Sequence, residues 1–303
     1  MKILLLGKDG QVGWELQRAL APLGELVAWG SAQADLRDPA GLEWKVRRER
    51  PQVIVNAAAH TAVDRCESEP DDAMAINATA PGVLAREAAA LDALFVHYST
   101  DYVFDGGGTR AWTEDDATGP LNMYGRTKLA GEAAIREAGG RHLILRTSWV
   151  YAARGANFPR TMLRLAAERD ALSVIDDQVG APTGAELIAD VTAHALRATL
   201  DRPELCGTYH LAAAGATTWH GYARHVIEAA RARDAHRVRV APDAIRAVPS
   251  AAFPTPARRP LNSRLHGGKL QRAFGLHLPD WRVGVDRLLA EWASAEPNPA
   301  PTR

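Results

Sequence analysis

Short apolar runs alternate with longer amphipathic stretches through the first half of the chain. The apolar runs, four or five residues each, lie at residues 3–6, 25–29, 53–56, 94–98 and 143–147. The stretches between them are long enough for helices and lie at 13–21, 40–50, 71–91 and 124–138. Few polar residues interrupt the apolar runs, as expected of strands that are buried on both faces of a sheet. The alternation of strand and helix therefore predicts an α/β fold with a doubly wound parallel sheet.

The pattern changes after about residue 150. A short strand is predicted at 208–211, and helices are predicted at 158–169, 185–200, 218–233 and 281–292. We therefore expect a Rossmann-type domain at 1–150 and a smaller C-terminal substrate-binding lobe at 151–293. The chain of this lobe is expected to return to the main sheet near 205–212. Residues 294–303 contain three prolines and are expected to form a flexible tail.

The charge balance argues against a dominant electrostatic partner. The 36 Lys and Arg residues equal the 36 Asp and Glu residues, which disfavours nucleic acid or an anionic membrane surface as a partner. No apolar stretch approaches the roughly 18 residues that a membrane span requires. The two cysteines, Cys66 and Cys206, are too few and too far apart for a disulfide scaffold or a zinc cluster. We therefore expect a cytoplasmic protein with no membrane or nucleic-acid partner.

Three regularly spaced glycines follow the first predicted strand. Gly7, Gly10 and Gly13 form a G-x-x-G-x-x-G pattern, with Gln11 and Val12 between the last two. Glycines let the backbone turn tightly and approach a pyrophosphate, and the N-terminus of the following helix supplies N–H donors. A plain glycine-rich loop is the alternative, but the position between the first strand and the first helix favours a dinucleotide site. The spacing is typical of extended short-chain dehydrogenases and reductases.

The end of the second strand bears on the choice of cofactor. A carboxylate there would bind the ribose hydroxyls of NADH and repel the 2′-phosphate of NADPH, but the chain has Gly30 and Ser31 instead. We therefore expect NADPH, with NADH as a substitute, although no arginine follows immediately to bind the phosphate. Asp35 and Leu36 are placed to line the adenine pocket. An ordinary loop acid is the alternative interpretation of Asp35.

Small residues follow the third predicted strand. The segment NAAAHT at 56–61 would let the backbone approach the cofactor closely. Ala59, His60 and Thr61 are therefore candidate cofactor contacts. For His60, a loop histidine with its hydrogen bonds satisfied inside the protein is the alternative.

A tyrosine and a lysine lie one turn apart on one face of a predicted helix. Tyr124 and Lys128 form a Y-x-x-x-K pattern, which by itself also suits a solvated helix face. The pKa of a free tyrosine is about 10, and a nearby ammonium would lower it, which would make the phenol a usable acid or base. Thr100 follows the fourth strand, at the sheet edge where doubly wound folds bind ligands. Tyr124, Lys128 and Thr100 are therefore the predicted catalytic residues.

Eight segments spread along the chain resemble the dTDP-4-dehydrorhamnose reductases. They are GKDGQVGWELQRAL, NAAAHTAVD, HYSTDYVFDG, YGRTKLAGE, RTSWVY, NFPRTMLRLA, DQVGAPTGAEL and TPARRPLNSRL. The resemblance covers essentially the whole chain except for the tail. The resemblance implies NADPH-dependent reduction of the 4-keto group of dTDP-4-dehydro-L-rhamnose, the last step of dTDP-L-rhamnose synthesis.

The resemblance also implies roles for particular residues. Tyr124 would be the catalytic acid, Lys128 would position the nicotinamide ribose, and Thr100 would tune the tyrosine. Contacts with the dTDP-sugar are implied for Val63, Thr100, Asp101 and Trp149. A core position is the alternative for Trp149.

A metal site and a homodimer are implied by the resemblance alone. Glu15, Glu186 and Glu291 match three glutamates through which some related enzymes dimerise around magnesium, an ion that prefers oxygen ligands. Each glutamate also suits an ordinary surface charge. Arg258 and Arg259 could pair with the diphosphate of the substrate, and an exposed basic turn is equally compatible with the sequence.

Three rival functions share parts of this pattern. A sugar-nucleotide dehydratase would need an acid–base pair after Thr100, but Asp101 is followed by Tyr102. An epimerase would share Tyr124 and Lys128, and the motifs of the second half disfavour it. A non-catalytic NADP-binding regulatory subunit is the third, and the intact catalytic set favours an enzyme.

Overall fold

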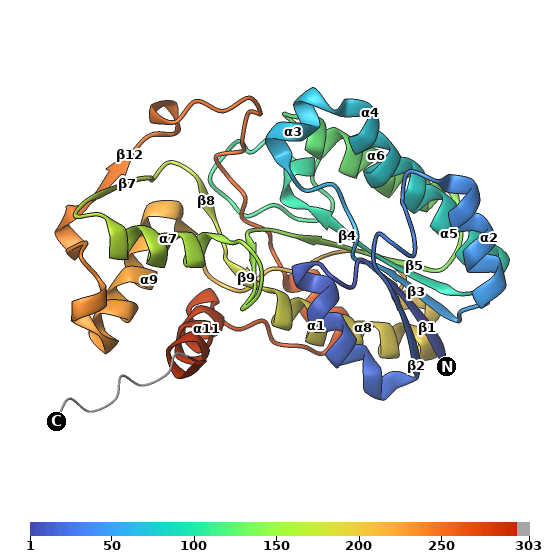
Figure 1. Ribbon diagram of the computed structural model, residues 1–303. Helices are drawn as coiled ribbons and strands as arrows, with labels where there is room; N and C mark the ends of the chain where they lie inside the picture. The colour runs from blue at the N-terminus through green and yellow to red at the C-terminus, as the bar shows by residue number, and fades with distance from the viewer. Residues whose placement is uncertain (296–303) are drawn as a thin grey trace.

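A six-stranded parallel sheet forms the centre of the structure (Figure 1). The structure, a computed structural model, describes residues 1–295. Across the sheet the strand order is β10-β5-β4-β3-β1-β2. In chain order the strands are β1 (Lys2–Leu6), β2 (Glu25–Trp29), β3 (Val53–Asn56), β4 (Leu94–Thr100), β5 (His142–Thr147) and β10 (Gly207–His210). The predicted α/β fold class is confirmed.

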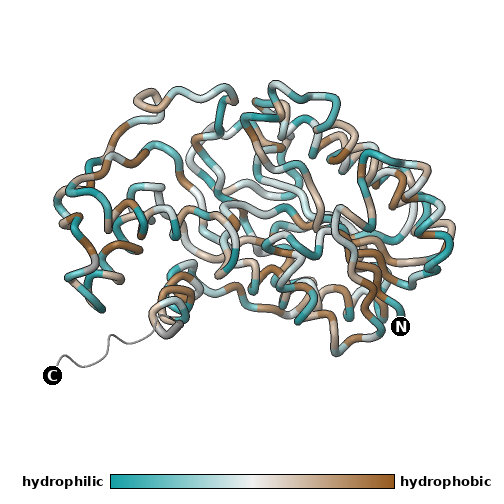
Figure 2. Tube along the Cα trace, in the orientation of Figure 1, coloured by the Kyte–Doolittle hydropathy of each residue, from teal (hydrophilic) through white to brown (hydrophobic). Residues whose placement is uncertain are grey.

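Helices cover both faces of this sheet. One face packs against α2 (Pro39–Glu49), α5 (Ala80–Ala90) and α6 (Met123–Glu137). The other face packs against α1 (Gln11–Leu20), α8 (Ala185–Asp201) and α10 (Gly268–Phe274). Because both faces are covered, the central strands are mostly apolar. β3 and β4 are buried at every position, their polar residues included. Figure 2 shows hydrophobic residues gathered along these strands.

The sheet grows in two directions from β1, and this reversal places the ligand crevice. β1 pairs with β2 on one side and with β3 on the other. In doubly wound sheets, ligands bind at the carboxyl ends of the strands where the order reverses. The loops after β1 and β3 therefore flank the expected site.

The segment predicted as one helix at 71–91 is interrupted. It forms α4 (Pro70–Met74), a π-helical turn (Ala75–Thr79) and α5, preceded by the short α3 (Val63–Ser68). Pro81 stands in the first turn of α5 and has no N–H to donate to the preceding turn. The missing hydrogen bond accounts for the widened turn.

The second lobe is a small helical layer with paired short strands. Its helices are α7 (Phe158–Glu168), α9 (Trp219–Arg233) and α11 (Trp281–Ala295). Its strands are β6 (Val150–Tyr151), β7 (Leu172–Ile175), β8 (Val179–Gly180), β9 (Thr183–Gly184), β11 (Thr217–Thr218) and β12 (Ile245–Val248). A separate apolar core, which includes Tyr222, Val226 and Trp281, holds this lobe together.

Among residues 1–295, no helix has the length and apolar character that crossing a membrane requires. Most of the tail expected at 294–303 lies outside the described residues.

Candidate active site

A cleft of about 760 Å³ opens at the carboxyl ends of the central strands. Loops after β1, β2, β3, β4 and β5 line it, and Trp219 contributes from the second lobe. Among the predicted cofactor, substrate and catalytic residues, those that line it are Gly7, Gly10, Gln11, Val12, Asp35, Leu36, Ala59, Thr61, Val63, Thr100, Asp101, Tyr124, Lys128 and Trp149. Gly13 and His60 do not line it. The volume lies within the usual range for small-molecule sites.

The glycine loop forms a tight cradle at one end of the cleft. Gly7 has a φ of 83°, and a Cβ there would come within 2.6 Å of the backbone nitrogen of Ala58. A Cβ on Gly13 would come within 1.9 Å of the Gly7 carbonyl oxygen, so Gly13 permits α1 to pack on the loop. No side chain caps the N-terminus of α1 at Gly10. The free end of this helix can therefore receive a phosphate.

An arginine that sequence reasoning missed lies beside the predicted adenine pocket. Arg37 lines the cleft with Asp35 and Leu36, and its Nε lies 3.1 Å from Asp35 Oδ1. Hydrogen bonds from the backbone and side chain of Arg37 hold the pKa of Asp35 below its ordinary value. The position expected for such an arginine is directly after the second strand, whereas Arg37 comes seven residues after Gly30. Only the path of the intervening loop brings it to the cleft.

The side chain of His60 contacts other side chains of the protein and does not line the cleft. Its Nδ1 lies 3.3 Å from Cys66 Sγ, and its Nε2 lies 3.4 Å from Glu69 Oε2. Its backbone N–H donates to Asn77 Oδ1 over 2.9 Å. His60 is thus a loop histidine whose hydrogen bonds are satisfied inside the protein, whereas its neighbours Ala59 and Thr61 line the cleft.

Two buried polar side chains lie where β4 ends. The hydroxyl of Thr100 donates to Asp101 Oδ1 over 3.1 Å and accepts from the N–H of Tyr102 over 3.2 Å. Thr100 also lowers the pKa of the Tyr124 phenol, against the larger effect of burial. Burial raises the pKa of Asp101 to about 7, although hydrogen bonds from Ser263 and Thr100 oppose the rise. Asp101 can therefore exist in either protonation state near neutral pH.

Tyr124 and Lys128 both face the cleft from α6. Lys128 Nζ donates to the carbonyl of Tyr98 over 2.6 Å and lies 3.1 Å from His97 Nε2. Burial lowers the pKa of Lys128 to about 8 and raises the pKa of the Tyr124 phenol above its ordinary value. The structure does not show the expected lowering of the pKa of Tyr124 by Lys128, because β4 holds the lysine amine.

Two stacked tryptophans form an apolar wall of the cleft. The rings of Trp149 and Trp219 have centroids 3.6 Å apart and an interplanar angle of 11°. Trp149 has a φ of 48°, and a Cβ on Gly180 would come within 2.6 Å of its ring. Trp219 Nε1 donates to Gln178 Oε1 over 3.1 Å. Sequence reasoning missed Trp219; its only signal was an aromatic residue near the start of the helix predicted at 218–233.

Known proteins resemble this chain over nearly its whole length. A family model described as the RmlD substrate binding domain matches residues 1–294. The chain belongs to this family. The dTDP-4-dehydrorhamnose reductase of Escherichia coli (strain K12) is 57% identical over 295 residues, which span 96% of this chain and 98% of that protein.

Solved structures of relatives in the RmlD family agree with the fold. The dTDP-4-dehydrorhamnose reductase of Clostridium acetobutylicum has a TM-score of 0.88 and 32% identity, covering 97% of this chain and 100% of that chain. The Bacillus anthracis reductase, solved in complex with NADP, has a TM-score of 0.86 and 31% identity, covering 96% and 99%.

The three glutamates expected to bind magnesium in this RmlD family member approach one another without forming a metal site. Burial raises the pKa of Glu186, and Glu291 and Glu15 raise it further against the opposing effect of Arg287. Arginines already pair with two of them, Arg18 with Glu15 at 3.4 Å and Arg287 with Glu291 at 3.1 Å. Within residues 1–295, no three His, Cys, Asp or Glu side chains are grouped to hold a metal. One chain by itself therefore does not fit the ion.

The two arginines considered for the diphosphate differ in their surroundings. Arg259 pairs with Asp64 of α3 over 2.8 Å, whereas Arg258 is exposed. The carbonyl of Arg258 accepts from Asn122 Nδ2 over 2.8 Å, and the other amide atom of Asn122 caps α6. The basic turn is therefore tied to the start of the helix that carries Tyr124.

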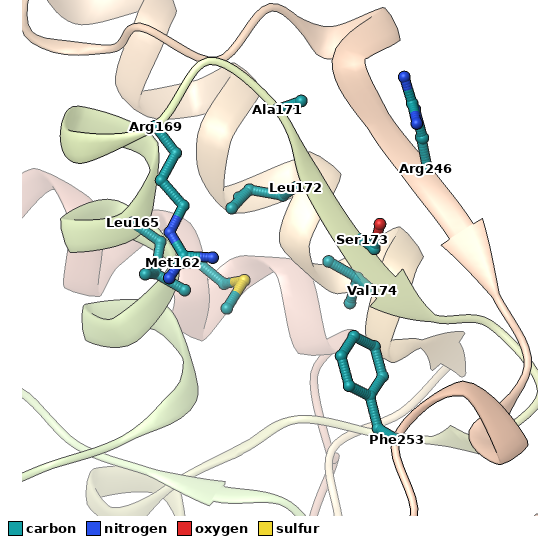
Figure 3. Close-up of a pocket in the computed structure, with 9 residues that line it drawn as sticks. All are labelled: Met162, Leu165, Arg169, Ala171, Leu172, Ser173, Val174, Arg246 and Phe253. Atoms are coloured by element: carbon teal, nitrogen blue, oxygen red, sulfur yellow. The ribbon is translucent and has the colours of Figure 1, made fainter.

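A second pocket, of about 480 Å³, lies in the second lobe between α7, β7 and β12. None of the predicted site residues lines it. Figure 3 shows the ring of Phe253, from the segment after β12, turned toward Val174 of β7. Its lining is Met162, Leu165, Arg169, Ala171, Leu172, Ser173, Val174, Arg246 and Phe253.

Proposed function

We propose that this protein reduces the 4-keto group of dTDP-4-dehydro-L-rhamnose with NADPH and releases dTDP-L-rhamnose. One observation carries the proposal: Tyr124, Lys128 and Thr100 line the same cleft as a glycine cradle at a helix N-terminus. The first group suits proton transfer to a carbonyl oxygen, and the second suits a dinucleotide. The names of the family relatives point to the same reaction.

The cleft offers matching groups for a dinucleotide cofactor. Gly7 and Gly10 would hold the pyrophosphate at the N-terminus of α1, and Lys128 would hold the nicotinamide ribose. Thr147 Oγ1 and Ser148 Oγ are buried at the cleft without a hydrogen-bond partner in the described chain, which leaves both hydroxyls for a polar ligand. When bound, the nicotinamide supplies the hydride.

Tyr124 supplies the proton. Reduction builds negative charge on the oxygen of the keto group, and a neutral phenol next to that oxygen can donate its proton as the charge develops. Burial keeps the phenol protonated because it raises the pKa of Tyr124. Thr100, which lines the same cleft, would tune the phenol because it lowers the pKa of Tyr124 against the larger effect of burial.

The sugar would lie between Tyr124 and the tryptophan wall. Trp149 presents a flat ring that suits the apolar face of a deoxysugar. Val63 and Asp101 line the same region of the cleft, and Asp101 can exchange hydrogen bonds with sugar hydroxyls in either protonation state.

The adenosine end supports NADPH, with NADH as a substitute. The guanidinium of Arg37 can bind a 2′-phosphate, whereas the carboxylate of Asp35 suits free ribose hydroxyls. Arg37 already pairs with that carboxylate, which reduces the repulsion that Asp35 would exert on the phosphate.

Magnesium and a homodimer stay predictions that rest on Glu15, Glu186 and Glu291. Glu15 and Glu291 both repel the carboxylate of Glu186 in a single chain, and a shared cation would relieve this repulsion. Measuring the molecular mass in solution with magnesium and with a chelator tests both. A mass that is monomeric in both conditions would contradict them.

The deciding experiment measures oxidation of NADPH, and separately of NADH, by the purified protein with dTDP-4-dehydro-L-rhamnose. We expect turnover with both cofactors, faster with NADPH, and dTDP-L-rhamnose as the product identified by mass spectrometry and chromatography. Tight NADPH binding without turnover would favour the non-catalytic regulatory subunit instead. Turnover with a different keto-sugar would keep the reductase and overturn the substrate.

A further inference from the structure

A buried chain of hydrogen bonds leads from β3 to the amine of Lys128. Asn56 ends β3 and lies opposite His97 of β4 in the sheet register, and both side chains are only 1% exposed. Asn56 Nδ2 lies 3.2 Å from His97 Nδ1, and His97 Nε2 lies 3.1 Å from Lys128 Nζ. None of these contacts has a part in the reaction proposed above.

The backbone fixes which way the amide of Asn56 points. The N–H of Ala58 donates to Asn56 Oδ1 over 3.1 Å, and a backbone N–H can only donate. The amide nitrogen must therefore face His97. Turning the amide over would place two donors against each other in a buried site.

The amide in turn fixes the tautomer of the histidine. Because Asn56 Nδ2 donates, His97 Nδ1 must accept and carries no proton. Burial is the main cause that holds the pKa of His97 well below its ordinary value, so the ring is neutral and has one N–H. That N–H is therefore on Nε2, and it points at Lys128 Nζ.

An N–H directed at the lysine needs a lone pair on Nζ. An ammonium has three N–H groups and no lone pair, whereas a neutral amine can accept from His97 and still donate to the carbonyl of Tyr98. The only carboxylate among the influences on Lys128 is Glu132, which Arg146 neutralises through two hydrogen bonds of 2.8 and 2.7 Å. Tyr124 and Tyr98, the other titratable groups nearby, stay uncharged at neutral pH because burial raises the pKa of each.

We propose that Asn56 and His97 are positioning residues that favour the neutral amine of Lys128 over the ammonium in the free protein. Above about pH 8, where the free amine is neutral, the lysine then takes a proton from solvent when the cofactor binds and its amine turns to the nicotinamide ribose. This second step rests on the proposed function, whereas the charge state of the free protein does not. The lowered pKa of Lys128 agrees with the hydrogen-bond pattern.

The test measures the titration of Lys128 in the free protein. The chain has only five lysines, so nuclear magnetic resonance of protein labelled at the lysine side chains gives a spectrum that one Lys128→Arg variant assigns. We expect Lys128 to titrate near pH 8, against an ordinary value of 10.5. In His97→Gln, the amide can turn its oxygen to the lysine, and we expect the titration to move up by about one unit or more.

A second variant and a matched control distinguish an effect of the His97 tautomer on Lys128 from a general loss of structure. In Asn56→Asp, a carboxylate oxygen would accept from His97 Nδ1 and move the proton of the ring there, so Lys128 is again expected to titrate at higher pH. His210→Gln changes another fully buried histidine, whose Nδ1 lies 3.1 Å from the carbonyl of Trp112, and should leave Lys128 unchanged. Thermal melting checks that each variant is folded.

Two measurements can overturn the proposal. It is wrong if wild-type Lys128 titrates at its ordinary value, or if both variants at positions 56 and 97 titrate as the wild type does. Calorimetry of NADPH binding in buffers of different ionisation enthalpy reports the proton taken up, which we expect above pH 8 in the wild type and to a smaller extent in both variants. A protein that shows the expected titration but reduces no sugar would contradict only the proposed function.

Discussion

At the scale of single residues, burial acts in opposite directions on the two titratable groups of the catalytic helix. It keeps the phenol of Tyr124 protonated because it raises that pKa, and it lowers the pKa of Lys128 to about 8. A reductase needs a proton donor at the phenol, so the first effect favours the direction of the proposed reaction. The second effect brings the pKa of Lys128 close to neutral pH, so that the groups in contact with its amine decide its charge.

Removing the phenol hydroxyl should separate chemistry from binding. In Tyr124→Phe we expect turnover to fall by about 10²- to 10⁴-fold, the usual contribution of a positioned acid. The dissociation constant of NADPH should change little, because the glycine cradle is intact. Steady-state kinetics and fluorescence titration measure the two quantities. Near-normal turnover would show that another group donates the proton.

Arg37 should set the preference between the two nicotinamide cofactors. In Arg37→Gln we expect the affinity for NADPH to fall roughly 10- to 100-fold, because a charge-assisted hydrogen bond contributes about 1.5–3 kcal/mol. NADH should bind nearly as before. Arg48→Gln, an exposed arginine of α2 outside the cleft, is the matched control. An equal loss for both cofactors would contradict this role.

The sequence predicted the side chains that helix or strand geometry brings together. It missed the side chains that loop conformation and lobe packing place at the cleft. Tyr124 and Lys128 are related by helix geometry, and Thr100 by the end of a strand, so their meeting could be expected. Arg37 and Trp219 reach the cleft through loop paths and lobe packing that no short spacing encodes. His60 shows the converse, because its neighbours line the cleft while its own side chain bonds elsewhere.

At the scale of elements, a buried ion pair joins α6 to the central sheet. Glu132 is fully buried and accepts two hydrogen bonds from Arg146 of β5, at 2.8 and 2.7 Å. Burial opposes ionisation of Glu132, but these bonds hold its pKa below the ordinary value. The pair fixes the catalytic helix one turn after Lys128.

Breaking this pair should destabilise the protein. In Glu132→Gln we expect the free energy of unfolding to fall by about 3–5 kcal/mol, because the guanidinium of Arg146 stays buried without its counter-charge. Urea denaturation measures the loss, and Glu137→Gln at the exposed end of the same helix is the control. A change below 1 kcal/mol, roughly the value of a surface pair, would contradict the prediction.

The same pair gives a dependence on pH with a definite sign. The pKa of Glu132 is lower in the folded protein than in the unfolded chain, so its stabilisation is present above the unfolded pKa and is lost as the pH falls through the folded pKa. Glu132→Gln should therefore lose less stability on acidification than the wild type. Equal slopes in the acid range would contradict this assignment.

Hydrophobic patterning predicted the main elements because both faces of the sheet are covered. The central strands have the largely apolar runs that such burial favours, and the helices between the strands show the matching amphipathic period. The strands of the second lobe escaped prediction because most are only two residues long, and tertiary contacts select them. The interruption at 75–79 depends on Pro81, and hydrophobic periodicity does not show the effect of a proline on the preceding turn.

At the scale of the whole molecule, the two halves of the chain share one apolar core. Leu143 and Leu145 of β5 pack in the same cluster as Ile188 and Leu196 of α8 and Tyr209 of β10. The second half therefore completes both the edge and one face of the central sheet. A division of the chain at residue 150 cuts through this core.

A fragment of residues 1–150 should consequently fail to fold stably. It would lack β10 at the edge of β5 and would expose the face that α8 covers, while the full chain should unfold in one cooperative transition. Circular dichroism and hydrogen exchange test both statements. A fragment with a sharp melting transition and protected strand amides would show that the first half is an independent folding unit.

The position of β10 at one edge of the sheet also has a consequence during synthesis. The ribosome must synthesise the chain as far as residue 210 before β10 can form and pair in parallel with β5. Until then the nascent chain presents a bare strand edge and an uncovered apolar face, the features by which folding intermediates attract one another. Overproduction that outpaces completion of the chain should therefore yield truncated products in inclusion bodies, and slower synthesis at lower temperature should reduce them.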